Sequence, residues 1–332
     1  MVDYFYSSAR VRALETGLLS REAYVRLLDA PVLQSAYAIL SEFGYACNTD
    51  SDGNFLREEM LLERLQSAYG EIAALTEGAD TRVFVLWQYP YDCNNLKAAI
   101  KCFIRGISCE SMLFDFGTVL AEDVLRAVQI NNFDAFPTHM AEAAREALSV
   151  YAKTQNPQQI DLLLDRACYR DMLDAAEASR NEYVIKLIRT RIDLLNLVMC
   201  IRTLRMRSGE AGALLLQDAL LDGGTLSKGD VAALYQREER QIWEQLLYTD
   251  YKGFAEMMPS NAPSLTELER AADDFWMSVV REARFIPCGA EVLVGYLCGV
   301  EYEVRNLRVL LAGKAAGLAG ETVWERIREG YV

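Results

Sequence analysis

The stretch Asp92-Cys93-Asn94-Asn95-Leu96-Lys97 places an acidic residue three positions before an Asn-Leu pair. The chain contains two further Asn-Leu pairs, and each has an acid at the same spacing: Asp193 with Asn196, and Glu303 with Asn306. Acids occupy 48 of the 332 positions, so three acids at this spacing have a chance of roughly 0.003. The signature therefore indicates an internal repeat.

A second marker, a Leu-acid-Arg triplet, precedes each signature. The triplets are Leu62-Glu63-Arg64, Leu164-Asp165-Arg166 and Leu268-Glu269-Arg270. From each arginine to the following acid the chain runs 28, 27 and 33 residues (92 − 64, 193 − 166 and 303 − 270). Two markers in one order predict three copies of a helical unit of about 100 residues. The predicted repeats are 1–115, which includes an N-terminal helix, 116–217 and 218–332, together forming one compact three-lobed unit.

Apolar residues recur at helical spacing almost throughout, and the chain has only 7 prolines. This pattern predicts an all-α fold. Asn156 before Pro157 is typical of a helix start, and Ser264 with Glu267 has the spacing of a capping box. We interpret the run from Val83 to Trp87 as helix, although a short strand has a similar pattern.

Glycines and loop-forming residues predict where helices end. Gly44, Gly223-Gly224 and Gly320 indicate breaks between helices, and the stretch 253–263 has the composition of a loop.

The signature acid and asparagine lie three residues apart, so on a helix they share one face. Such side chains commonly cap a helix or bond a neighbouring backbone, and we favour this architectural role over direct contact with a partner. The alternative stays open for all six positions. They are Asp92, Asn95, Asp193, Asn196, Glu303 and Asn306.

Composition argues against several classes of protein. A net charge of −14 without a basic cluster argues against binding to nucleic acid. The eight cysteines form no C-x-x-C pair, so we expect free buried thiols in a reducing cytosol. The N-terminus does not resemble a secretion signal. The longest apolar run, 292–300, is far short of the roughly 20 residues that span a bilayer.

No stretch of the sequence has the pattern of a catalytic site. His139 is the single histidine, which argues against Ser-His and His-rich metal systems. Gly313-Lys314 is followed by Ala315 where a phosphate loop needs Ser or Thr. Asp161 and Asp165 share a helix face, but salt bridges to Arg166 and Arg170 explain them better than a metal. We expect no catalytic residue, no cofactor and no metal site.

The whole chain resembles one family, the C subunit of bacterial and archaeal V/A-type rotary ATPases, which is the counterpart of the d subunit in the eukaryotic vacuolar enzyme. The resemblance rests on the stretch Tyr6 to Glu15, on Asp92 to Lys97, and on Glu303 to Arg308 with its continuation to Leu318. One departure is that Lys97 and Arg308 follow two of the Asn-Leu pairs, whereas Val198 follows the other.

The resemblance implies a three-lobed, all-helical funnel with pseudo-threefold symmetry. Such a protein performs no catalysis and couples the rotor axle to the membrane proteolipid ring, in a complex that links ATP to proton or sodium transport. The implied partners are the axle subunits and the ring, without self-association, at the cytoplasmic side of the membrane. A generic α-helical scaffold is the alternative hypothesis, and an α-helical metal-dependent enzyme is a third.

Overall fold

The computed structural model describes residues 4–77, 80–206, 209–258 and 263–332. Across these ranges the regular elements are helices, and the β-structure is one isolated bridge between Thr49 and Phe55. The all-α prediction is thereby confirmed. The chain divides into two compact units, residues 1–79 with 250–332 and residues 80–249. The predicted division into three repeats stays a prediction.

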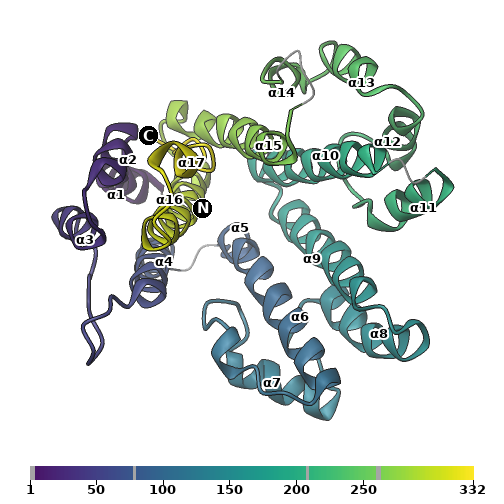
Figure 1. The fold of residues 1–332 in the computed structure, drawn as a ribbon, viewed down its shortest axis with the longest axis horizontal. Coiled ribbons are helices and arrows are strands. Elements are labelled where there is room, and N and C mark those ends of the chain that lie inside the picture. Colours follow the sequence, from purple (N-terminus) through teal and green to yellow (C-terminus); the bar gives the residue numbers. More distant parts are fainter. Residues whose placement is uncertain (1–3, 78–79, 207–208, 259–262) are drawn as a thin grey trace. The chain divides into compact units, whose positions relative to one another are not determined.

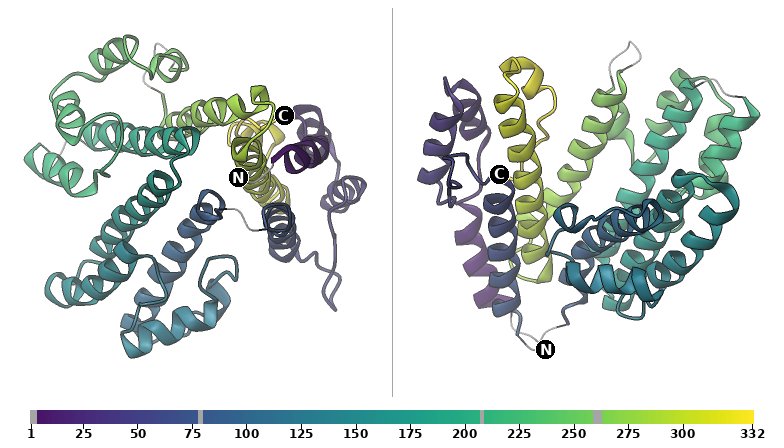
Figure 2. Two further views of the ribbon diagram at one scale, coloured as in Figure 1. Left: turned by 180° about the vertical axis from the view of Figure 1, so that it is seen from behind. Right: turned by 60° about the horizontal axis from the view of Figure 1, so that its bottom comes forward.

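The first unit combines the two ends of the chain. Helix α16 is buried along most of its length and packs against α1, α3, α4 and α17, and Figure 2 shows α4 and α16 side by side. The elements are α1 (Tyr4–Glu15), α2 (Arg21–Asp29), α3 (Leu33–Glu42), α4 (Arg57–Leu75), α14 (Lys252–Glu256), α15 (Leu265–Val280), the 3₁₀ helix η3 (Arg281–Phe285), α16 (Ala290–Ala315) and α17 (Gly320–Trp324).

The second unit is centred on α9, which packs against α6, α8 and α10 (Figure 1). The elements are α5 (Arg82–Val85), η1 (Leu86–Gln88), α6 (Tyr89–Arg105), η2 (Glu110–Met112), α7 (Ala121–Ile130), α8 (Thr138–Thr154), α9 (Pro157–Ser179), α10 (Glu182–Arg205), α11 (Glu210–Ala219), α12 (Lys228–Tyr235) and α13 (Glu239–Leu246).

The local predictions of helix starts are confirmed. The Asn156 side chain accepts from the Gln158 amide at the start of α9. Ser264 and Glu267 form the capping box of α15. The run from Val83 to Trp87 is helical, divided between α5 and η1.

Gly320 lies at a break as predicted, because residues 316–319 separate α16 from α17 and Gly320 is the first residue of α17. The loop signal was partly misplaced, since residues 253–256 of the predicted loop belong to α14. Phe254 and Ala255 of this helix are buried, and tertiary packing of this kind can override a weak local helix propensity. Residues 259–262 of that predicted loop lie outside the described ranges.

The C-terminal tail is held within the first unit. The Tyr331 ring packs against α16 so closely that a Cβ at Gly299 would come within 2.8 Å of the tyrosine side chain. The Tyr331 hydroxyl donates to Glu15 of α1 over 3.1 Å. Arg12 of the same helix donates to the carbonyls of Ala283 and Ile286, each over 2.7 Å. The N-terminal helix and the C-terminal tail therefore depend on each other for packing.

None of the helices in the described ranges combines the length and the apolar character that crossing a membrane requires.

Candidate functional site

The three signature asparagines make the same pair of hydrogen bonds. Each is buried on its helix, and its side-chain amide donates to the carbonyl and accepts from the amide of one downstream residue. Asn95 pairs in this way with Phe114 (2.8 and 3.0 Å), Asn196 with Leu221 (3.0 and 2.9 Å), and Asn306 with Arg328 (2.9 and 2.9 Å). Each asparagine thus fastens one residue of an irregular segment to its helix.

The signature aspartates bind the segment just before the next short helix. Asp92 accepts from the amides of Thr118 (3.0 Å) and Val119 (3.1 Å), two residues before α7 begins. Asp193 accepts from the amides of Thr225 (2.7 Å) and Leu226 (3.1 Å), two residues before α12 begins. These bonds satisfy backbone groups that burial would otherwise leave without partners.

Glu303 makes the equivalent bond to the opposite end of the chain. It accepts from the Leu19 amide over 2.6 Å, two residues before α2 begins. It also accepts from the Tyr45 hydroxyl (2.6 Å) and from Arg64 Nε (3.1 Å). The short helix that corresponds to α7 and α12 is therefore α2, at the N-terminus.

A glycine two residues before each bonded Val or Leu fixes this correspondence. Gly117 and Gly224 lie so close to their aspartates that an added Cβ would come within 2.0 Å of a carboxylate oxygen. Gly17 occupies the same position before Leu19, where the partner is the longer Glu303 and the nearest contact is 3.4 Å from Leu14. The shared position of these glycines was not predicted from the sequence. A comparison of the residues that follow each signature finds only Gly117 and Gly224. Gly17 is missed because it lies before its signature, almost the whole length of the chain away.

Ion pairs join the signature helices to the marker helices. Lys97 of α6 pairs with Asp165 of α9, and Arg308 of α16 pairs with Glu58 of α4 over 2.9 Å. Val198 offers no charge at the same position of α10. Arg64, the arginine of the first marker, reaches Glu303, so a marker and a signature meet directly.

The acidic pair Asp161 and Asp165 is bonded to lysines. Lys101 and Lys97 of α6 provide the counter-charges, each over 2.5 Å. Salt bridging was the expected role, but the expected partners were wrong. Arg170 pairs with Asp174 over 3.1 Å, and within the described ranges Arg166 makes no such bond, because α6 packs alongside α9 and brings the lysines closer. Among the described residues, no three Cys, His, Asp or Glu side chains are grouped as a metal site would require.

The other candidate residues have structural partners. The backbone amide of His139 donates to Asp171 (3.0 Å), and its ring lies 2.9 Å from Asp174. Lys314 lies in α16 and donates to the carbonyls of Leu28 (2.9 Å) and Ala30 (2.7 Å), at the C-terminal end of α2. A cation at a helix C-terminus is favourable.

Burial shifts several pKa values. It raises the pKa of Asp92 above its ordinary value, although the bonds from Thr118 and Val119 favour the ionised form. Burial alone would lower the pKa of Arg64, but the Glu303 carboxylate, together with Tyr296 and Tyr45, more than offsets this and raises it. Burial also raises the pKa of the Cys200 thiol to about 12. All eight cysteines are free thiols, and six of them are buried.

Comparison with known proteins gives a consistent result over the full chain. The family model of the ATP synthase (C/AC39) subunit matches residues 7–326. The chain is similar to the C subunit of the A-type ATP synthase of Methanosarcina mazei, with 23% identity over 98% of this chain and 92% of the relative.

Two bacterial relatives give the same picture. The C subunit of the V-type sodium ATPase of Enterococcus hirae is 22% identical over 99% of both chains, and the C subunit of the V-type ATP synthase of Deinococcus radiodurans is 24% identical over 98% of this chain and 91% of the relative. Because the family model covers nearly every residue, the chain belongs to the ATP synthase (C/AC39) subunit family.

Proposed function

We propose that the chain is a non-catalytic central-stalk subunit of a V/A-type ATPase or ATP synthase, which couples the rotor axle to the membrane proteolipid ring. The observation that carries the proposal is the family match over residues 7–326. The relatives are C subunits of A-type and V-type enzymes, in one case a sodium ATPase. The proposed role is therefore in ATP-linked proton or sodium transport.

The bonding of the six signature side chains supports a mechanical role. All six are buried, at 3% exposure or less, and their polar atoms bond the backbone or side chains of the same chain. We propose that they are architectural positions that stiffen the protein instead of contacting a partner. A protein that transmits torque needs this kind of rigidity, which dense packing and satisfied buried polar groups provide.

The recurring bonds also support the proposed arrangement. Three helices of one kind, α6, α10 and α16, each fasten a short segment in the same way. Three lobes in a pseudo-threefold funnel, peripheral to the membrane on its cytoplasmic side, would suit a cap on a ring. We propose that the axle subunits and the proteolipid ring are the partners.

The test is co-migration of the purified chain with each partner. The chain is mixed with the axle subunits in one experiment and with detergent-solubilised proteolipid ring in another, and each mixture is run on a sizing column. We expect a complex in both, and the chain alone should elute as a 37.4 kDa monomer. Absence of a complex with either partner would refute the coupling role.

A further inference from the structure

The eight free cysteines include two pairs of neighbouring thiols in the second unit. The Cys168 thiol on α9 donates a hydrogen bond to the sulfur of Cys93 on α6. Cys93 Sγ in turn lies 3.4 Å from the carbonyl oxygen of Leu164, one helical turn before Cys168. The Cys109 thiol, just beyond α6, donates to the sulfur of Cys102 in the last turn of that helix. Two thiols in contact lie close to the separation that a disulfide requires.

The turn after α6 brings Cys109 back to Cys102. Gly106 ends the helix in the left-handed conformation, with a φ of +66°. The Ile107 amide donates to the Cys102 carbonyl over 3.1 Å, so the chain reverses direction beside Cys102. At the start of η2 the Cys109 carbonyl accepts from the Met112 amide over 2.8 Å. Local backbone structure therefore holds the two thiols together.

The Cys102–Cys109 pair lies beside an exposed turn. Both side chains are buried, at 6% and 3% exposure, but residues 105–108, which join them, are exposed. Cys93 and Cys168 lie within two helices that pack against each other, so a reagent reaches that pair only when α6 and α9 separate. Opening one exposed turn costs much less than separating two packed helices. An oxidant therefore reaches the Cys102–Cys109 pair first.

The other two signatures have no thiol at the position of Cys102. Counting from the signature asparagine, Cys102 corresponds to Thr203 of α10 and to Gly313 of α16. The Thr203 hydroxyl donates to the Met199 carbonyl of its own helix over 2.8 Å. An added Cβ at Gly313 would come within 2.5 Å of the Val323 side chain. The shared architecture of the three signatures therefore does not explain the thiol pair.

We propose that Cys102 and Cys109 form a redox-active dithiol, which a low-molecular-weight disulfide such as oxidised glutathione converts reversibly to an intramolecular disulfide. A metal fits the pair less well, because a structural zinc takes four ligands and among the described residues no third Cys, His, Asp or Glu joins the two thiols. The disulfide would tie the turn after α6 to that helix, close to Phe114, which Asn95 already fastens. Oxidation would thus stiffen the segment between α6 and α7. The proposal concerns this chain alone and does not depend on its partners.

The reaction consists of two thiol–disulfide exchanges. The Cys102 thiol loses its proton and attacks one sulfur of oxidised glutathione, which releases one glutathione and leaves a mixed disulfide on Cys102. The Cys109 thiol then loses its proton and attacks the Cys102 sulfur, which forms the Cys102–Cys109 bond and releases the second glutathione. Two electrons pass from the protein thiols to oxidised glutathione, and the two protons end on the released glutathiones.

The order of the two exchanges follows from the environment of Cys109. Burial and the neighbouring Cys102 thiol raise the pKa of Cys109 to about 11, so its thiolate is scarce at neutral pH and Cys102 attacks first. The mixed disulfide removes the contribution of the Cys102 thiol to this shift. Cys109 therefore becomes a better nucleophile at the step where it is needed.

The test is disulfide mapping of the folded chain. The chain is equilibrated with oxidised and reduced glutathione, the remaining thiols are trapped with iodoacetamide, and the peptides are analysed by mass spectrometry. We expect a Cys102–Cys109 linkage that dithiothreitol reverses, with the other cysteines left as thiols. Cys109→Ser should stop at the mixed disulfide and keep one glutathione on Cys102, whereas Cys102→Ser should leave Cys109 as a thiol. The matched control is Cys93→Ser, which removes a buried thiol of the other pair and should still form the linkage.

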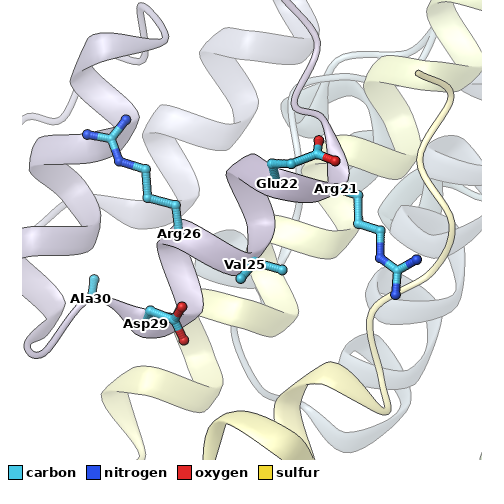
Figure 3. Close-up of a pocket in the computed structure, with 6 residues that line it drawn as sticks. All are labelled: Arg21, Glu22, Val25, Arg26, Asp29 and Ala30. Carbon is cyan, nitrogen blue, oxygen red and sulfur yellow. The ribbon is translucent and has the colours of Figure 1, made fainter.

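Two comparisons with the wild-type chain complete the test. The folded chain should form the linkage at a ratio of oxidised to reduced glutathione about tenfold lower than the urea-unfolded chain, because the turn already holds the thiols together. Oxidation should slow hydrogen exchange in residues 107–113 but not in α2 of the first unit, the helix that lines the hollow in Figure 3. The proposal would be overturned by no linkage in the folded chain, by glutathione retained on wild-type Cys102, by easier linkage in urea, by unchanged exchange in 107–113, or by loss of the linkage in Cys93→Ser.

Discussion

Replacing Asn196 by alanine should lower the free energy of unfolding far more than the small change in side-chain size suggests. The side chain is 1% exposed, and its two bonds satisfy the amide and the carbonyl of Leu221, which is itself 7% exposed. Leaving each of these buried groups without a partner costs about 1–3 kcal/mol. Alanine is the better helix former by roughly 0.6 kcal/mol. We therefore expect a net loss of about 2–5 kcal/mol.

The assay is urea unfolding followed by far-UV circular dichroism, with hydrogen exchange at the Leu221 amide as a local measure. The matched control is Asn94→Ala, which changes the same residue type on an exposed helix position of α6. The control should be neutral or slightly stabilising. The loss for Asn95→Ala should lie between those for Asn94→Ala and Asn196→Ala, because its partner Phe114 is 41% exposed and water can replace the lost bonds. An Asn196→Ala chain within about 0.5 kcal/mol of the control would refute the reasoning.

Three further predictions concern packing, a buried ion pair and pH. Gly299→Ala should lower the free energy of unfolding by about 1–3 kcal/mol in urea unfolding, because the new Cβ would lie 2.8 Å from the buried Tyr331 side chain. The control is Gly70→Ala in the middle of α4, where the new Cβ would have nothing within 4 Å. This substitution should raise the free energy of unfolding by about 0.5–1 kcal/mol. Arg64→Met should lower the free energy of unfolding by about 3–5 kcal/mol, because it removes the ion-pair partner of the buried Glu303. The control is Arg166→Met, which changes the arginine of the second marker and should cost under about 1 kcal/mol in the same assay. Burial raises the pKa of Asp92 in the folded state, so the contribution of this shift to stability is present below the ordinary aspartate pKa and is lost as pH rises through the raised pKa. The free energy of unfolding of wild type relative to Asp92→Asn, measured in urea across that pH interval, should therefore fall as pH rises. A difference that does not change with pH would contradict this prediction.

The sequence was sufficient to predict the helices and the recurrence of the signature. Spacing alone placed each acid and asparagine on one helix face, and an architectural role was the favoured interpretation. The bonding partners could not be predicted. Asn95 and Asn196 reach 19 and 25 residues downstream, because irregular segments of different length lie between. Only folding brings those backbone groups to the helix.

Long-range contacts account for the other differences. Glu303 bonds Leu19, 284 residues away, so a search of the residues that follow the third signature cannot find the short helix beside Leu19. The lysines that neutralise Asp161 and Asp165 come from α6, 60 and 68 residues earlier. Sequence patterns indicate which face of a helix is buried, but they do not indicate which helix covers it.

The most direct test of the coupling role compares ATP hydrolysis with ion transport in vesicles that contain the complete ATPase or the ATPase rebuilt without this chain. If the chain couples the axle to the ring, removing it should leave hydrolysis in the catalytic head while ATP-driven proton or sodium uptake falls to background. Adding the purified chain back should restore uptake. Undiminished ion uptake in vesicles that lack the chain would contradict the account.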